Sequence, residues 1–258
     1  MIEIVIICIT AFLTAILTFF SGFGLGTILS PVMMLFFPVE IAVALTGVVH
    51  FSNNLFKLWL VGKKADIPTV LRFGLPAIVA AFIGAWLLLQ MSTLPIAFSY
   101  QLWNQHFEVS SFKIIMAVLL FFFALMDLLP YFGKLEFSPK MITLGGFITG
   151  FFGGFSGHQG ALRSAFLIRS GLKKEAFIAT GVLVSSMIDL TRVGVYTKRL
   201  MDVKLEEYWV LIVVASLSAM LGAVLGNRLL KKVTMKSLQY LVAVFLILIA
   251  MALGLGWL

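Results

Sequence analysis

The sequence is poor in charge and in cysteine. Only 12% of its 258 residues are Asp, Glu, Lys or Arg, about half the share that soluble domains carry. Cys8 is the single cysteine, which excludes an internal disulfide and any metal site built from several cysteines. The three histidines are scattered over the chain at positions 50, 106 and 158, so we expect no metal site.

Motifs of familiar enzyme chemistry are also missing. The chain has no GxxxxGK[ST] phosphate loop, no GxSxG nucleophile elbow and no HExxH zinc motif. Hydrolysis of ATP and common hydrolase reactions therefore lack support, and we expect neither an enzyme nor a cofactor. An intramembrane enzyme that uses Ser156, His158 or Asp189 is kept as an alternative, although a serine two residues from a histidine is poorly placed for direct activation.

Long hydrophobic runs dominate the chain instead. Hydrophobic residues make up 61% of it, and the mean hydropathy is +1.10. Runs close to the roughly 20 residues that a helix needs to cross a bilayer cover residues 2–20, 41–61, 70–91, 112–132, 177–196, 208–225 and 238–257. We therefore expect an all-α polytopic membrane protein with little chain outside the bilayer. The start lacks the basic region of a cleaved signal peptide, so the first run is expected to be retained.

Two of the apolar segments are interrupted by glycine. The first reads FSGFGLGTILSP over residues 20–31, and the second reads FSGHQGALRSA over residues 155–165. A broken helix at membrane depth is tolerated only where its freed backbone groups face protein or a water-filled cavity. The two glycine turns are therefore the predicted functional site. The alternative is that these glycines only allow helices to pack closely.

The chain contains an internal repeat. An offset of 134 residues aligns identical residues in order. The aligned pairs are Gly26 with Gly160, Ser30 with Ser164, Thr46 with Thr180, Gly47 with Gly181 and Ser52 with Ser186. A small shift also aligns Gly84 with Gly222. We predict two repeats, residues 1–132 and 133–258, each with a glycine-broken re-entrant or hairpin segment and three transmembrane helices, about eight membrane segments in all.

The basic residues predict how the repeats are oriented. If each broken segment enters and returns on one side, the three crossings that follow it invert the second repeat. One face then collects twelve basic residues and the other face four. The twelve are Lys63, Lys64, Arg72, Lys134, Lys140, Arg169, Lys173, Lys174, Arg228, Lys231, Lys232 and Lys236, and the four are Lys113, Lys198, Arg199 and Lys204. The richer face is predicted to be cytoplasmic, with both termini on the opposite side. The net charge of +8 then reflects orientation, and no nucleic-acid partner is expected.

Several short motifs, in this order, resemble the TauE/SafE family of sulfite exporters, also called TSUP or DUF81, over nearly the full length. They are SGFGLGTILSP at 21–31, ALTG at 44–47 and IGA at 83–85, with FFGGFSG at 151–157, ATG at 179–181 and LGA at 221–223 as counterparts. The resemblance implies a secondary transporter that exports sulfite, thiosulfate or organosulfonates through the cytoplasmic membrane. The implied partners are a small anionic substrate and the lipid bilayer, and homo-oligomer formation is left open. A passive anion channel is the nearest alternative, and a membrane scaffold is another.

Polar groups at the two turns are the predicted substrate ligands. Helix N-termini offer free N–H groups and a positive dipole end to an anion, and a guanidinium such as that of Arg163 binds an oxyanion bidentately. The predicted set is Ser21, Gly22, Gly24, Gly26, Ser30, Thr46, Ser156, Gly157, His158, Gln159, Gly160, Arg163, Ser164 and Thr180. Arg163 could instead extend to the cytoplasmic face.

Further charged residues lie inside the apolar runs. Asp189 and Arg192 are three residues apart and therefore on one face of a helix. Asp189 or His158 is a candidate for proton coupling, and the alternative for the Asp189–Arg192 pair is a structural ion pair near the outer end of its helix. Lys57 is expected to extend to the cytoplasmic surface, and His50 is expected to form an interhelical hydrogen bond.

Overall fold

The structure is a computed structural model that describes residues 2–19, 24–129, 137–202, 208–229 and 235–258. In chain order its elements are α1 (Ile2–Thr18), α2 (Gly26–Met34), α3 (Val39–Val61), η1 (Gly62–Lys64), α4 (Ile67–Met91), β1 (Ile96–Leu102), β2 (Gln105–Ser110), α5 (Ser111–Leu128), η3 (Pro139–Met141), α6 (Ile142–Ser156), α7 (Gly160–Leu167), α8 (Lys174–Asp202), α9 (Trp209–Leu229) and α10 (Met235–Gly254). Within the described residues, five helices are long and apolar enough to cross a membrane. The expected helical membrane protein is confirmed at this level.

Both predicted breaks are turns between two helices. Helix α6 ends where Gly157 takes a left-handed conformation with φ of 82°, which glycine adopts without steric cost, and α7 begins at Gly160. In the first copy Gly24 has φ of 81° before α2 begins, and the Thr27 hydroxyl donates to the Gly24 carbonyl at 2.9 Å. Ser21 and Gly22, predicted as ligands, lie outside the described residues.

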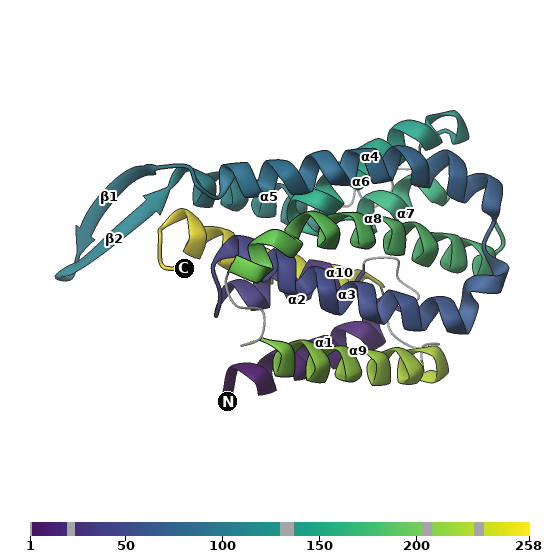
Figure 1. The fold of residues 1–258 in the computed structure, drawn as a ribbon, viewed down its shortest axis with the longest axis horizontal. Coiled ribbons are helices and arrows are strands. Elements are labelled where there is room, and N and C mark those ends of the chain that lie inside the picture. Colours follow the sequence, from purple (N-terminus) through teal and green to yellow (C-terminus); the bar gives the residue numbers. More distant parts are fainter. Residues whose placement is uncertain (1, 20–23, 130–136, 203–207, 230–234) are drawn as a thin grey trace.

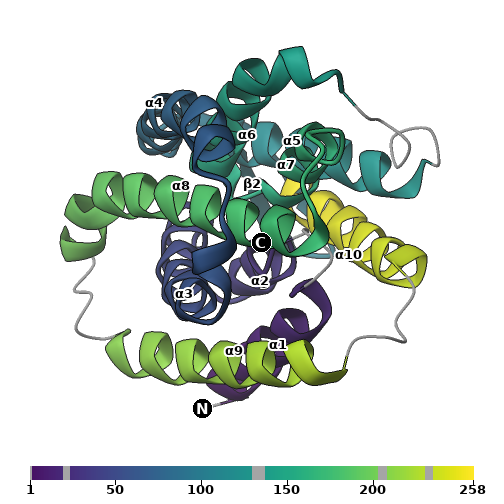
Figure 2. The same cartoon turned by 90° about the vertical axis from the view of Figure 1, so that its right-hand side faces the viewer.

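The helices of the two halves pack in an exchanged pattern. Helix α1, the first of its half, lies along α9, and α6, the first long helix of the other half, lies along α4. Helix α3 packs against α8, and α5 packs against α10 (Figures 1 and 2). Each of these contacts joins an element of residues 1–132 to one of residues 133–258. The core is therefore shared between the halves.

Glycines determine how closely these helices approach. A Cβ at Gly146, Gly150 or Gly154 on α6 would lie 2.1 Å from a carbonyl oxygen of α4, those of Phe73, Ala77 and Ala81 respectively. Small residues of this kind allow backbones to approach within a membrane.

The aligned pair Gly84 and Gly222 serves the same purpose in both halves. A Cβ at Gly84 on α4 would lie 2.2 Å from the Phe151 carbonyl oxygen of α6, and one at Gly222 on α9 would lie 2.3 Å from that of Phe12 on α1. Both positions therefore need a residue without a side chain. These two glycines, which lie away from the two turns, allow close packing of helices.

A β-hairpin adds to the expected all-helical fold. Strands β1 and β2 pair antiparallel, and Trp103 and Asn104 form the turn with φ of 53° and 63°, the positive values of a tight hairpin turn. The hairpin extends beyond the helix ends (Figure 1). Its base is fixed to the C-terminal segment, because the Tyr100 hydroxyl donates to the Leu255 carbonyl at 2.6 Å. The predicted all-α fold contained no strand, and residues 92–111 lay between two predicted membrane runs.

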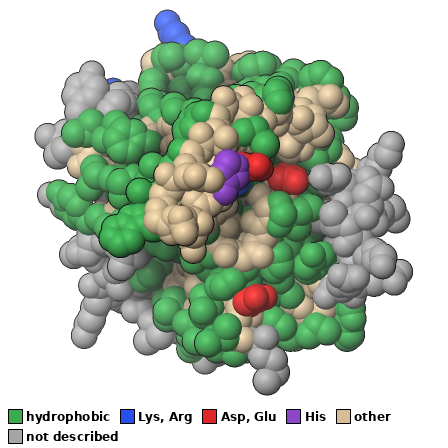
Figure 3. Space-filling view, turned by 90° about the vertical axis from the view of Figure 1, so that its left-hand side faces the viewer, with side chains coloured by type: hydrophobic (Ala, Val, Ile, Leu, Met, Phe, Trp, Pro, Cys, Tyr) green, Lys and Arg blue, Asp and Glu red, His purple; other side chains and the backbone are tan. Residues whose placement is uncertain are grey.

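Connections gather at the two ends of the molecule. At one end Lys64 after α3 lies 3.3 Å from Glu175 at the start of α8. There Asp66 caps α4, and hydrogen bonds from the Thr69 side chain and backbone lower the pKa of the Asp66 carboxyl. The other end carries the hairpin and both termini (Figure 1). Viewed from that end, the described surface is mostly hydrophobic and shows few Lys or Arg side chains (Figure 3).

A cationic cavity beside the two glycine turns

The two glycine turns meet inside the molecule. A Cβ at Gly26 would lie 3.1 Å from the Gly157 carbonyl oxygen, and one at Gly24 would lie 3.9 Å from the Cα of Gly160. Turns more than 130 residues apart in the sequence are thus in direct contact. Their glycines have two roles: positive φ at Gly24 and Gly157, and space for the opposite turn at Gly26.

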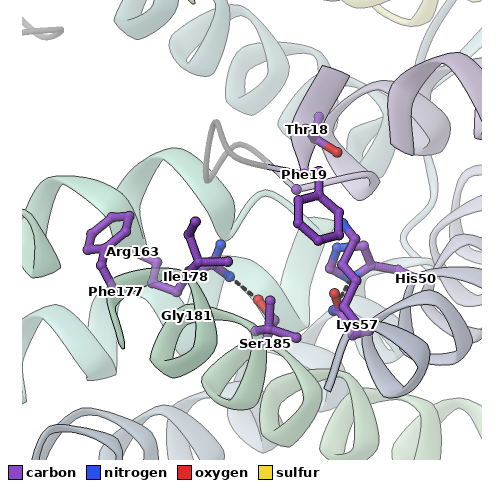
Figure 4. A pocket seen from close by; sticks show the side chains of 12 residues that line it. Thr18, Phe19, His50, Lys57, Arg163, Phe177, Ile178, Gly181 and Ser185 are labelled. Carbon is purple, nitrogen blue, oxygen red and sulfur yellow. Dashed lines mark hydrogen bonds between the residues drawn. The ribbon is translucent and has the colours of Figure 1, made fainter. Parts of the chain in front are cut away.

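A cavity of about 30 Å³ lies beside these turns, enough for about one water molecule. It is lined by α1, the first turn, α3, α7 and α8 (Figure 4). Its polar lining consists of Thr18, His50, Asn54, Lys57, Arg163 and Ser185. Among the described residues that line it, none is Asp or Glu. Two cationic side chains thus share a buried space that has no carboxylate in its wall.

Lys57 is the first of these cations. Its side chain is only 4% exposed, and Nζ lies over the Phe19 ring, 5.4 Å from the centroid, within the range of a cation–π contact. The described residues give it no carboxylate partner. The expectation that Lys57 extends to the cytoplasmic surface is wrong, because α3 directs the side chain into the cavity (Figure 4).

Arg163 is the second cation, and it faces the cavity as the first of the two sequence interpretations predicted. The residue is 7% exposed, and its Nη1 donates to the hydroxyl of Ser185 on α8 (Figure 4). Gly181 leaves the room that the guanidinium occupies, since a Cβ there would lie 3.2 Å from Arg163 Nε. Glycine is therefore needed at position 181, in the second Thr-Gly pair, because a side chain there would take the space of the guanidinium.

A buried network centred on Asp189 borders the cavity. Asp189 is 0% exposed and accepts hydrogen bonds from His50 Nδ1 at 2.6 Å, Asn54 Nδ2 at 2.8 Å, Gln159 Nε2 at 2.9 Å and Arg192 Nε at 3.0 Å. Arg192 Nη2 lies 2.9 Å from the same carboxylate. The carboxylate therefore connects α3, the second turn and α8.

The expected ion pair of Asp189 and Arg192 is present. Arg192 also lies beside Gly47 of the first Thr-Gly pair and Gly157 of the second turn: a Cβ at Gly47 would lie 3.5 Å from its Cζ, and one at Gly157 would lie 3.0 Å from its Nη1. Arg192 lies over Gly47 and Arg163 over Gly181, the equivalent glycines of the two halves, although both arginines belong to residues 133–258. Each Thr-Gly pair accommodates a buried guanidinium.

Other predicted ligands have partners elsewhere. The Thr180 hydroxyl accepts from the Asp66 backbone N–H at 2.8 Å, and the Ser156 hydroxyl donates to the Phe152 carbonyl at 3.1 Å. The His158 ring stacks on Phe123 with centroids 4.9 Å apart, and its Nδ1 donates to the Ser156 carbonyl at 3.1 Å. None of these three residues lines the cavity.

The remaining predicted hydroxyls are buried close to the turns. Ser30 and Thr46 have side-chain oxygens with no hydrogen-bond partner among the described residues, and so does Ser164. They do not line the cavity in this conformation. Gln159 reaches the site through Asp189, and Gly24 contributes to the cavity wall directly.

The sequence interpretation did not assign the lining residues of α3 to the site. His50, Asn54 and Lys57 are spaced i, i+4 and i+7, so they share one helix face. That polar stripe in an apolar run was the available signal. Ser185 on α8 had no comparable signal, because many membrane serines bond only to their own helix. Within the described residues no group of His, Cys, Asp or Glu could hold a metal ion.

A second cavity lies at the end of the molecule that carries η1. It has a volume of about 400 Å³ and is lined in part by Lys64, Lys174 and Glu175. Phe19 and Ile178 line both cavities, so the two are neighbours. We call the second cavity the vestibule.

The comparison with protein families agrees with this architecture. Residues 7–253 match the family described as Sulfite exporter TauE/SafE. No curated protein and no solved structure matches the chain. The family match covers nearly all of the 258 residues, and five of the described helices are long and apolar enough to cross a membrane. The chain belongs to the TauE/SafE sulfite exporter family.

Proposed function

We propose that the protein is a secondary transporter that exports a small sulfur oxyanion, such as sulfite, or an organosulfonate through the cytoplasmic membrane, and that the anion binds between Lys57 and Arg163. One observation carries the proposal: two buried cations line one cavity whose described wall has no carboxylate. Burying a cation costs several kcal/mol. An anion in the cavity offsets part of that cost.

The polar groups around the cations suit an oxyanion. Asn54 and Ser185 reach the cavity together with the two cations, and an oxyanion accepts hydrogen bonds from such donors on several sides. A cation would be repelled by Lys57 and Arg163. The vestibule supplies the proposed route on the side of Lys64 and Lys174. Lysines at an entrance attract anions, and Glu175, 3.3 Å from Lys64, offsets part of that positive charge.

Alternating access by two inverted repeats is the proposed mechanism. The division into residues 1–132 and 133–258 is supported by the exchanged packing of α1 on α9 and α6 on α4, and by the equivalent positions of Gly84 and Gly222. Inverted-repeat transporters bind substrate near the bilayer midplane at broken helices. The contact between the two glycine turns fits that arrangement.

Flux through purified protein in liposomes tests the proposal. We expect saturable uptake of labelled thiosulfate and sulfite, with counterflow, which distinguishes a carrier from a channel. Arg163→Gln and Lys57→Met should each weaken apparent affinity about 10- to 100-fold, since a hydrogen bond to a charged group contributes about 1.5–3 kcal/mol.

Matched control variants are available at the surface. Arg72→Gln and Lys63→Met remove the same charges from exposed positions and should leave the affinity unchanged. Monodisperse elution from a sizing column confirms that each variant is folded. Equal flux in Arg163→Gln, Lys57→Met and the two controls would rule out this binding site, and single-channel currents would replace the carrier by a channel.

A further inference from the structure

His50 connects the cationic cavity with the Asp189 network. Its ring lines the cavity, and it is buried at 2% exposure. Every hydrogen bond that the described residues form with the imidazole ring involves Nδ1. The other nitrogen, Nε2, lies 3.4 Å from the position of a Cβ on Gly24, which also lines the cavity. The two nitrogens therefore face different surroundings.

The geometry fixes the role of each nitrogen. Asp189 Oδ2, 2.6 Å from Nδ1, is a carboxylate oxygen and can only accept, so Nδ1 carries a hydrogen. In the neutral ring Nε2 then holds a lone pair on the cavity side. Asn54 Nδ2 lies 3.2 Å from Nδ1. It is also a donor, and it donates one of its hydrogens to Asp189. The site is thus arranged to take one proton at Nε2.

We propose that His50 Nε2 binds a proton together with the anion, so that each transported anion is accompanied by one proton; this rests on the proposed anion site. A hydronium ion in the vestibule transfers its proton to the Nε2 lone pair: one O–H bond breaks, one N–H bond forms and water is left, while the imidazolium keeps its Nδ1–H on Asp189. Release reverses the step: the Nε2–H bond breaks and the proton returns to water as hydronium when the anion leaves.

The charges around His50 make anion and proton binding cooperative. Lys57 from its own helix, Arg163 from α7 and Arg192 from α8 oppose a further positive charge, whereas Asp189 favours it. Helix α2 and the described side chains of α9 carry no titratable group. An anion beside Lys57 and Arg163 cancels their repulsion and favours the imidazolium. By reciprocity the proton strengthens anion binding by the same factor.

Thiosulfate is the probe that isolates this effect, since it stays a dianion between about pH 5.5 and 8, the range in which an imidazole changes charge. In liposomes that contain the wild-type protein, thiosulfate entry should carry protons inward, read by a trapped pH dye. Thiosulfate should follow an imposed proton gradient in either direction, and its affinity should fall by up to about tenfold for each unit by which the pH rises, the limit for one linked proton.

His50→Gln is the decisive variant. It should lose proton movement and the pH dependence of thiosulfate affinity. Thiosulfate counterflow, which needs no net proton transfer, measures how much anion binding the variant keeps. His106→Gln, on the exposed hairpin, is the matched control and should behave as the wild type. Proton movement that persists in a folded His50→Gln protein would overturn the proposal.

The wild type alone keeps the test informative if His50→Gln does not fold. Net thiosulfate entry without accompanying proton movement would overturn the role of His50 and leave the anion site standing. Absence of any anion flux would instead overturn the proposed function. The two failures are thus distinguishable.

Discussion

At the scale of single residues, Asp189 combines the most interactions. Its carboxylate accepts from His50, Asn54, Gln159 and Arg192. A buried ion pair contributes little net stability when both partners are present, but removal of one partner leaves a charge buried without compensation. The network therefore matters less for total stability than for the positions of the side chains around it.

Asp189→Asn should strongly destabilise the protein, by about 3–5 kcal/mol, because Arg192 loses its counter-charge. The double variant Asp189→Asn with Arg192→Met should lose less, since it also removes the uncompensated guanidinium. Thermal unfolding in detergent, followed by tryptophan fluorescence, compares the three proteins. A double variant less stable than Asp189→Asn alone would contradict this account.

Part of the site could be predicted from the sequence at this scale. Arg163 stood out because a charge beside a glycine turn needs a cavity or a partner, and the structure places it in a cavity. Lys57 was misassigned because distance from a helix end says nothing about which face a side chain occupies. His50, Asn54 and Lys57 share one face, and attention to that face would have identified the cavity wall.

At the scale of the elements, the contact of α6 with α4 depends on the absence of side chains. Gly150→Val should prevent close approach, because even its Cβ would lie 2.1 Å from the Ala77 carbonyl oxygen. Overpacking costs about 1–3 kcal/mol or more. Folded yield on a sizing column measures the effect.

Gly194→Val is the control for that prediction. Gly194 lies on α8, and a Cβ at this position would have no other atom within 4 Å, so the same substitution changes helix propensity equally without a clash. Equal yields for Gly150→Val and Gly194→Val would show that the α4–α6 contact tolerates a larger separation.

The elements differ in how clearly they could be predicted from the sequence. The transmembrane helices followed from apolar runs of sufficient length. The hairpin was missed, although apolar and polar residues alternate in IAFSYQL and QHFEVS, the period of a strand. A search for long apolar runs does not register a segment whose apolar residues alternate with polar ones.

At the scale of the whole molecule, the orientation can be tested with the single cysteine removed. In a Cys8→Ser background, Trp103→Cys at the hairpin turn should react with an impermeant maleimide applied to intact cells, because the distribution of basic residues predicts that this end lies outside. Lys63→Cys, exposed at the opposite end, should react only after the membrane is opened. The reverse pattern would invert the proposed topology.

The whole-molecule arrangement was only partly accessible to sequence. The repeat offset indicated two similar halves, but their interleaving, with α1 on α9 and α6 on α4, depends on glycine contacts between residues far apart in the chain. Such contacts become visible only in three dimensions. The predicted internal symmetry remains a proposal that these contacts support.

The attachment of the hairpin has a mechanical consequence. Tyr100 holds the Leu255 carbonyl, and a Cβ at Gly256 would lie 2.9 Å from the Glu108 carbonyl oxygen, so the base of the hairpin fastens the end of α10 to the start of α5. These two helices also pack along each other. We expect α5 and α10 to stay together as one rigid unit while the other helices move relative to it during transport. The largest displacements are then expected at the opposite end of the molecule, around Phe19 and Ile178.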